Sequence, residues 1–263
     1  MIGIGKWTIG GWVMRILITN DDGIMSEGIY TLAKELEKDN DVTIVAPEAQ
    51  RSAQSHAITL NKPLVVKEVK LEGLKSKAYS ISGTPADCVR ASMDMLVDEK
   101  IDIVFSGINM GLNSGMDILY SGTVSAAIEA NIFNKPAIAV SAELIDGKIN
   151  YEIAAKLARK VLEDTKDYLL KTNMVLNINT PFKLDDIEKE IKICKIGGVI
   201  YDYYYMDTDE NGEKVLKLKG RKESKLVEGT DRYYLSKGYA TLTPLLYDLT
   251  NFELLEQVKD WFK

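Results

Sequence analysis

The feature that most constrains this chain is a strand–helix–strand pattern near its start. Residues 14–19 form a short apolar run that ends in the turn-forming sequence Asn-Asp-Asp-Gly at 20–23. Apolar residues then recur at helical spacing over 26–38, and a second buried strand is predicted at 41–47. Two strands joined by a helix in about 30 residues are expected to run in parallel. The chain therefore begins as a βαβ unit of a parallel sheet.

The same alternation continues to about residue 180. Further strands are predicted at 63–70, 77–82, 101–106, 136–142 and 174–179. Further helices are predicted at 84–97, 124–133 and 151–170, the first of them with Thr84 as its cap and Pro85 at its first position. Strands and helices in this order predict a doubly wound, mostly parallel α/β sheet.

The last third of the chain has a different pattern. Residues 201–219 hold two strand-like runs around Asp-Glu-Asn-Gly at 209–212, which predicts a β-hairpin, and a terminal helix fits 252–262. The hairpin is an arm that would either pack on its own domain or reach a neighbouring subunit. We therefore divide the chain into an N-terminal extension at 1–13, a doubly wound core at 14–180 and a C-terminal region with the hairpin arm at 181–263.

Composition narrows the classes of partner. The net charge is −6 and no Lys/Arg-rich run is present, which argues against binding to a nucleic-acid polymer. No apolar run approaches the roughly 20 residues that cross a bilayer, so no membrane association is expected. Cys88 and Cys194 are far apart and form no metal-binding pattern. Free thiols of this kind fit a reducing cytoplasm.

Two of the predicted strands end in residues that suit metal and phosphate chemistry. The strand predicted at 14–19 is followed by Asn20, Asp21 and Asp22. The strand predicted at 101–106 is followed by a segment that contains Gly107, Asn109 and Asn113. Ligands of open α/β sheets bind beyond the carboxyl ends of the strands. Two adjacent carboxylates repel each other unless one is protonated or a cation lies between them. Mg²⁺ and Mn²⁺ prefer the oxygens that Asp21, Asp22 and Asn109 supply, and Ser52 would add another. The alternative is that 20–23 is only a strand-ending turn.

Two further features point to phosphate but have simpler explanations. Ser121, Gly122 and Thr123 open a helix, and free N–H groups at a helix N-terminus bind phosphate. The simpler explanation is an ordinary Ser/Thr cap. His56 is the only histidine, and it would either hold a phosphate oxygen or protonate a leaving hydroxyl, or else be structural. No P-loop motif and no G-x-S-x-G elbow is present.

From residue 14 onward the chain resembles the SurE family, the survival protein E nucleotidases. The shared motifs occur in order as RILITNDDG (15–23), AP (46–47), RS (51–52), IT (58–59), SGTPADCV (82–89), SGINMGLN (106–113), YSGTVSAA (120–127), TD (230–231) and TPL (243–245). The resemblance implies a Rossmann-like core and a 5′/3′-nucleotidase that needs Mg²⁺ or Mn²⁺. It also implies a homodimer or homotetramer formed through the C-terminal arm.

The resulting hypothesis is metal-assisted hydrolysis of nucleoside monophosphates. The resemblance assigns Asp21, Asp22, Ser52 and Asn109 as metal ligands, which are the three residues of the strand ends together with Ser52. The metal would polarise the phosphate and activate a water, with Asp21 or Asp22 as base. The residues expected to bind the phosphate are Asn20, His56, Gly107, Asn113, Ser121, Gly122 and Thr123. Polyphosphate or a sugar phosphate is an alternative substrate, and a nucleotide-sensing module without turnover is the non-enzymatic alternative.

Overall fold

The fold is described from a computed structural model, which covers residues 7–8, 11–97, 100–184, 186, 191–199, 202–221 and 225–262. Within these residues one mixed sheet has nine strands in the order β10-β13-β9-β8-β7-β3-β4-β6-β5. Their bounds are β3 (Arg15–Thr19), β4 (Asp41–Pro47), β5 (Val66–Val69), β6 (Lys77–Ile81), β7 (Ile103–Met110), β8 (Ala137–Ala142), β9 (Val175–Thr180), β10 (Ile191–Ile193) and β13 (Ala240–Leu245). Six neighbouring strands of this sheet run parallel to one another, namely β9, β8, β7, β3, β4 and β6. Strand β5 pairs antiparallel with β6, and β13 pairs antiparallel with β9. The predicted doubly wound, mostly parallel sheet is confirmed.

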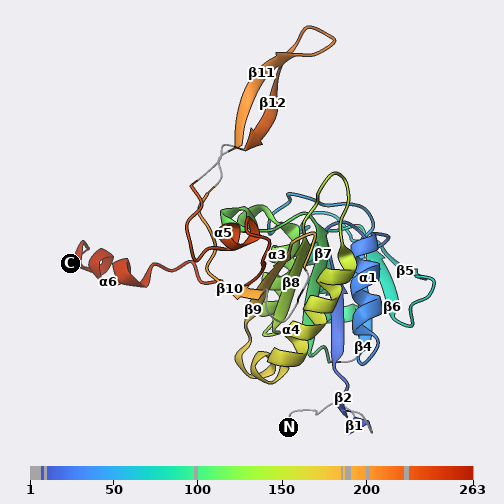
Figure 1. The fold of residues 1–263 in the computed structure, drawn as a ribbon. Coiled ribbons are helices and arrows are strands. Elements are labelled where there is room, and N and C mark those ends of the chain that lie inside the picture. Colours follow the sequence, from blue (N-terminus) through green and yellow to red (C-terminus); the bar gives the residue numbers. More distant parts are fainter. Residues whose placement is uncertain are drawn as a thin grey trace.

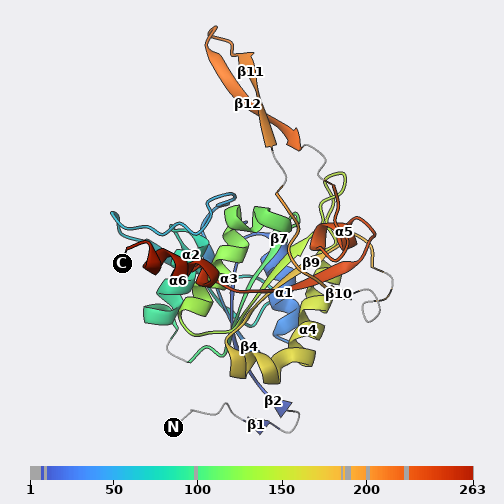
Figure 2. The same ribbon diagram turned by 90° about the vertical axis from the view of Figure 1, so that its left-hand side faces the viewer.

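Helices cover both faces of this sheet (Figures 1 and 2). Helices α1 (Glu27–Leu36) and α4 (Tyr151–Thr172) pack on one face, and α2 (Pro85–Ala91) and α3 (Gly122–Ile132) pack on the other. Two smaller helical elements follow α2 and β7, a short π-helix at Ser92–Leu96 and a 3-10 helix η2 at Gly115–Tyr120. Strand β7 lies in the middle of the sheet and therefore contacts helices from both layers.

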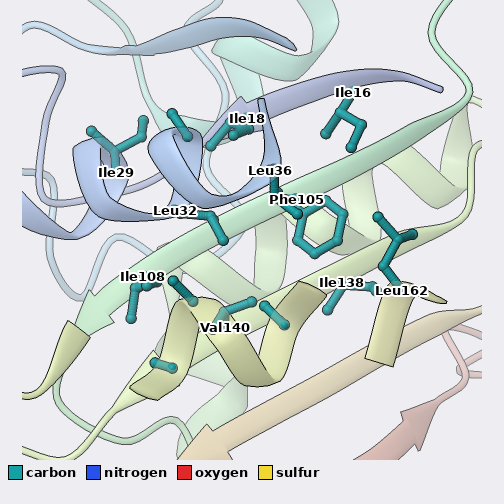
Figure 3. Close-up of a cluster of buried hydrophobic side chains, with 14 of the residues drawn as sticks. Ile16, Ile18, Ile29, Leu32, Leu36, Phe105, Ile108, Ile138, Val140 and Leu162 are labelled. Carbon is teal, nitrogen blue, oxygen red and sulfur yellow. The ribbon is translucent and has the colours of Figure 1, made fainter. Parts of the chain in front are cut away.

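The larger core lies between the sheet and the α1–α4 face. Figure 3 shows Leu32 and Leu36 of α1 directed at Phe105 of β7, with Ile138 and Leu162 beside the same ring. All five side chains are almost completely excluded from solvent. Burying one such side chain contributes about 1.5–3 kcal/mol relative to leaving it exposed. This core fixes β3 and β7 side by side, and these are the two strands whose ends carry the predicted site.

Two of the differences between the predicted and the observed element bounds have a physical reason that can be stated. Strand β7 continues to Met110, beyond the predicted end at residue 106, because Ile108 is fully buried in the α1–α4 core. Helix α2 keeps the predicted cap, Thr84, which forms a capping box with Asp87, but its α-helical part ends at Ala91 and a short π-helix follows. The glycine-rich loop after β7 therefore begins at Gly111.

Three elements of the C-terminal third were not predicted, namely β10, β13 and the short helix α5 (Asp231–Leu235). Strand β13 pairs with β9, so the sheet extends past residue 180, where we predicted the core to end. The predicted arm is present as the hairpin of β11 (Asp202–Thr208) and β12 (Lys214–Arg221), which stands away from the core in Figure 1. The predicted terminal helix is present as α6 (Phe252–Asp260). The boundaries of the three predicted regions stay a prediction.

Two observations complete the description. In the predicted N-terminal extension, β1 (Trp7–Thr8) pairs with β2 (Gly11–Trp12). Across the described parts of the chain, no helix combines the length and the apolar character that crossing a membrane requires.

Candidate active site

The two predicted strand ends meet at the carboxyl edge of the sheet. Strands β3 and β7 are parallel neighbours, with Thr19 opposite Ser106. Asp22 follows β3 and accepts a hydrogen bond at its Oδ2 from the backbone N–H of Met110, at 2.9 Å. Gln50 donates to the other oxygen at 3.3 Å. Asp22 therefore joins the end of β3 to the end of β7.

Asn20 shapes the turn that carries the two aspartates. Its Nδ2 donates to the carbonyl of Gly23 at 3.0 Å and to Oγ of Ser26 at 2.7 Å, and its Oδ1 accepts from the N–H of Gly23 at 3.1 Å. Gly23 has a φ of +100°, a conformation that favours glycine. The side chain of Asn20 thus closes the turn, and it is not among the residues that line the adjoining cleft.

Asp21 lies at the centre of the site. Only 4% of the residue is exposed, and Oγ1 of Thr123 donates to its Oδ1 at 2.5 Å. Burial, together with the nearby charge of Asp22, raises the pKa of Asp21 to about 6, although hydrogen bonds from Thr123 oppose the shift. Burial also raises the pKa of Asp22. A buried carboxylate beside a second one is an unstable pair that a divalent cation would stabilise.

Ser52 reaches the same place on the polar loop after β4. The backbone N–H of Arg51 donates to the carbonyl of Asp21 at 2.7 Å. Farther along this loop, Ser55 donates from Oγ to the carbonyl of Leu119 at 2.6 Å. These bonds tie the loop to the turn after β3 on one side and to η2 on the other.

A cleft of about 760 Å³ opens at this edge of the sheet. It is lined by Asp21, Ser52, Ala53, Asn109, Met110, Leu112, Asn113, Met116, Asp117, Leu119, Tyr120, Ser121, Val199, Tyr204 and Leu218. Its polar end holds Asp21, Ser52 and Asn109, three of the four predicted metal ligands. Of the predicted phosphate contacts, Asn113 and Ser121 also line it.

Helix α3 begins beside Asp21. Oγ of Ser121 caps the helix by accepting from the N–H of Val124 at 3.1 Å. A Cβ placed on Gly122 would lie 2.9 Å from Cβ and 3.1 Å from Oδ2 of Asp21, so the absence of a side chain permits this approach. The first turn of α3 thus meets the acidic end of the cleft.

Gly107 and His56 lie elsewhere. Gly107 is inside β7, where an added Cβ would stand 2.3 Å from the carbonyl oxygen of Val140. Nε2 of His56 lies 2.6 Å from Oε2 of Glu129, and Arg90 donates to the other oxygen of Glu129 at 2.9 Å. His56 does not line the cleft, and its bond to Glu129 fits the structural interpretation of this residue.

The donor set suits a hard divalent cation. Asn109 donates from Nδ2 to the carbonyl of Gly111 at 2.8 Å, so its amide nitrogen is used within the loop and its amide oxygen is the atom that suits a cation. Two carboxylates, an amide oxygen and a hydroxyl are ligands that Mg²⁺ and Mn²⁺ accept. Among the described residues no group of three or more His, Cys, Asp or Glu side chains forms an alternative metal site.

Sequence reasoning missed the residues that hold the cleft wall from behind. Asn177, Asn179, Asp231 and Arg232 hydrogen-bond to the loop at 113–115. Their bonds span between 64 and 118 residues of chain, so no local pattern reveals them. The sequence signal for Asp231 is the Thr-Asp pair at 230–231, one of the motifs that carry the family resemblance.

This fold and this edge define a class of protein: doubly wound α/β proteins with a paired-carboxylate site at the carboxyl ends of the central strands. The chain belongs to one family of that class, since the family model described as survival protein SurE matches residues 16–202.

Individual relatives agree with this assignment. A protein named 5′-nucleotidase SurE from Clostridium tetani is 50% identical and covers 95% of this chain and 100% of its own length. A protein of the same name from Clostridium botulinum (strain Kyoto / Type A2) is 55% identical and covers 95% of this chain and 99% of its own length. The crystal structure of the SurE protein from Aquifex aeolicus is 32% identical, with a TM-score of 0.81, and covers 95% of this chain and all of that one.

Proposed function

We propose that the protein is a divalent-metal-dependent phosphatase that hydrolyses nucleoside 5′-monophosphates, and 3′-monophosphates, to nucleoside and phosphate. The observation that carries the proposal is the cleft whose lining joins Asp21, Ser52 and Asn109 with apolar and aromatic side chains. A phosphate would bind at the polar end, and a base would lie against Met116, Tyr120 or Tyr204. The relatives named 5′-nucleotidase support the choice of substrate.

Asp21, Asp22, Ser52 and Asn109 would hold the metal, which we propose to be Mg²⁺ or Mn²⁺. A metal bound there supplies a Lewis acid and a water of lowered pKa. Thr123 orients Asp21 through its 2.5 Å hydrogen bond, and the Met110 N–H orients Asp22. Asp21 or Asp22 would also accept the proton of the attacking water.

The remaining chain groups would bind and shield the phosphate. The first turn of α3, at Ser121, Gly122 and Thr123, directs the positive end of the helix at the polar end of the cleft. Asn113 lines the same cleft. Phosphate contacts by Asn20, Gly107 and His56 stay predictions, because these side chains or positions lie outside the cleft lining.

The test is phosphate release from a panel of 5′- and 3′-nucleotides, a sugar phosphate and polyphosphate, with Mg²⁺, with Mn²⁺ and with chelator. We expect nucleotide turnover that stops with chelator. Replacing Asp22 by Asn should lower kcat/KM at least roughly a hundredfold, because it removes a charged ligand of the metal. Asp102→Asn is the matched control, since Asp102 is a carboxylate paired with Arg15 next to the start of β7, at the other end of that strand.

Each alternative predicts a different result in this panel. Faster phosphate release from polyphosphate or from a sugar phosphate would mean that this compound, and not a nucleotide, is the main substrate. Tight nucleotide binding without release under any metal would favour a sensing module. Near-normal turnover by the Asp22→Asn protein would reject the ligand set.

The partners and place of action are proposed on other grounds. We propose a homodimer or homotetramer, because the hairpin and α6 expose apolar side chains that a partner would cover. We also propose action in the cytoplasm, since Cys88 and Cys194 are both free and buried.

A further inference from the structure

The apolar wall of the cleft is built from two segments that are far apart in the chain. The loop after β7 and the following η2 contribute Leu112, Met116 and Tyr120, and the root of the hairpin contributes Val199 and Tyr204. Ile118 of η2 and Ile196 at the hairpin root both pack on the core of the α2–α3 face. Direct hydrogen bonds between the two segments would further fix their separation and hence the shape of the wall.

Asp231 joins the two segments directly. Its Oδ2 accepts from the N–H of Gly115 at 2.7 Å, and its Oδ1 accepts from the N–H of Gly197 at 2.7 Å. Oδ1 also accepts from the N–H of Arg232 at 2.7 Å, and Asp231 is fully buried. Hydrogen bonds to a buried charged acceptor are among the stronger ones in proteins. One carboxylate thus links the loop at Gly115 to the hairpin root at Gly197.

Arg232 holds the same loop one residue earlier. Its Nη2 donates to the carbonyl of Ser114 at 3.0 Å and lies 3.2 Å from Oδ2 of Asp117, which lines the cleft. The residue is 7% exposed, and a Cβ on Gly115 would stand 2.1 Å from its Nε. Glycine at this position lets the guanidinium lie against the loop backbone.

Two asparagines of β9 complete the attachment. Nδ2 of Asn177 and Nδ2 of Asn179 both donate to the carbonyl of Asn113 at 2.9 Å. Oδ1 of Asn179 accepts from the backbone N–H of Asn113 at 2.8 Å. The backbone at residues 113, 114 and 115 is therefore bonded, one residue after another, to side chains that follow residue 175. None of these side chains lines the cleft.

We propose that Asp231 and Arg232 are positioning residues that set the shape of the apolar wall and thereby the affinity for the nucleoside part of the substrate. The inference rests on the proposed nucleotidase function and assigns the two residues no part in binding the metal. Their bonds end on the loop and the hairpin root, whereas Asp21 and Asp22 are held by Thr123, Met110 and Gln50.

The test compares a nucleotide with p-nitrophenyl phosphate, a small ester that has no nucleoside. Asp231→Asn replaces one acceptor oxygen by an NH₂ group that faces a backbone N–H, so one of the two links is lost. We expect KM for the nucleotide to rise roughly tenfold while kcat changes less than about twofold, because only binding remote from phosphorus is weakened. Both constants for p-nitrophenyl phosphate should stay within about twofold of the unmodified protein.

Arg232→Lys is the second variant, and it tests the proposal if Asp231→Asn does not fold. Both contacts of Arg232 come from Nη2, and the lysine ammonium, on a shorter side chain without the planar guanidinium, does not reach the same position. A smaller rise in nucleotide KM is expected. Asp102→Asn is the control, because Asp102 also accepts a backbone N–H, from Arg15 at 2.9 Å, and pairs with its guanidinium.

Hydrogen exchange at the Gly115 amide separates this inference from the proposed function. We expect faster exchange in Asp231→Asn and unchanged exchange in Asp102→Asn. Equal losses with both substrates, an unchanged nucleotide KM, or unchanged exchange at Gly115 would overturn the positioning role. If the unmodified protein releases no phosphate from any nucleotide, the proposed function fails, and the exchange result alone decides whether Asp231 holds the loop.

Discussion

At the scale of single residues, the site depends on how closely Asp21 can approach the start of α3. Thr123 donates to one carboxylate oxygen, and Gly122 leaves room for the other. The same contact explains two residue choices at once. A helix start that binds phosphate would tolerate many residues here, but one that also packs against a buried aspartate requires glycine.

Replacing Gly122 by Ala should lower the activity while leaving the thermal stability almost unchanged. The new Cβ would lie 2.9 Å from Cβ of Asp21, so the carboxylate must move. Alanine in a helix is favoured over glycine by about 1 kcal/mol, which offsets part of the strain. We expect a Tm within a few degrees of the unmodified protein but a loss of kcat/KM of roughly tenfold or more, because misplacing a catalytic group by 1 Å is costly.

The control for this variant is Gly198→Ala, where an added Cβ meets nothing within 4 Å. Steady-state kinetics and thermal unfolding are measured for both proteins. Equal activity in Gly122→Ala and Gly198→Ala would mean that Asp21 is not fixed by this contact.

The sequence predicted the acidic turn but not its surroundings, and the reason is physical. Asp21 and Asp22 follow a strand directly, so local chemistry alone placed them at a sheet edge. The role of Thr123 depends on a contact across 102 residues, which no local pattern records. His56 is a second example, because its surroundings also depend on a distant contact. The sequence left a phosphate-binding, a proton-donating and a structural role open for His56, and the buried Glu129 on α3 determines where its ring lies.

At the scale of elements, helix α3 links the site to the interior. Its first turn meets Asp21, and Glu129, two turns later, is 2% exposed and lies between His56 and Arg90. His56 belongs to the loop that also carries Ser52. The bond between His56 and Glu129 therefore attaches the loop that carries a predicted metal ligand to the same helix whose N-terminus meets Asp21.

Glu129→Gln should destabilise the protein in a pH-dependent way. Burial raises the pKa of Glu129, but His56 and Arg90 lower it by more, so the pKa is lowered overall. A carboxylate with a lowered pKa in the folded state stabilises the fold above its unfolded pKa and loses this contribution as pH falls through the folded value. We expect the variant to lose about 1–3 kcal/mol of unfolding free energy at pH 7. The difference from the unmodified protein should shrink as the pH is lowered below 4.5, the ordinary value for this carboxyl.

Urea unfolding between pH 7 and pH 3 measures this difference. Glu163→Gln on α4 is the control, because Glu163 also bonds an arginine but its side chain is 56% exposed. Exposed pairs contribute at most about 1 kcal/mol. A pH-independent loss in Glu129→Gln would show that the charge of Glu129 does not stabilise the fold.

Elements with strong periodicity were predicted well, and the elements that were missed have identifiable reasons. Strand β13 contains Pro244, which argues against a central strand. In the described structure Pro244 pairs with Leu176 of β9, while β10 pairs with β13 only as far as Leu242. The proline therefore lies where one side of the strand has no described partner. Strand β10 and helix α5 are too short, at three and five residues, to show a period.

At the scale of the whole molecule, the C-terminal third adds β10 and β13 to the sheet, whereas its hairpin and α6 lie outside the sheet. Figure 1 shows the hairpin and α6 standing off the core in different directions. Helix α6 has no buried residue, and Phe252, Trp261 and Phe262 are each at least 64% exposed. Soluble monomers rarely expose apolar side chains in such groups. The whole-molecule prediction is therefore assembly through these elements.

The final prediction concerns the arm itself. Met206 of β11 and Leu216 of β12 are directly opposite each other and are 61% and 63% exposed. Opposite residues share one face of a hairpin, so the pair forms an apolar patch. We expect the unmodified protein to have a light-scattering mass of at least twice the 29.3 kDa chain mass. Replacing both residues by Glu should shift it toward the monomer, because two charges would have to be buried in the interface.

The control is Lys171→Glu at the end of α4, which changes the net charge by the same amount, −2, at an exposed position outside the arm. It should leave the assembly intact. If the double variant keeps the mass of the unmodified protein, the patch at Met206 and Leu216 is not in the interface. A monomeric unmodified protein would contradict the whole proposal of assembly, and the arm would then have to act within a single chain, where its root already forms part of the cleft wall through Val199 and Tyr204.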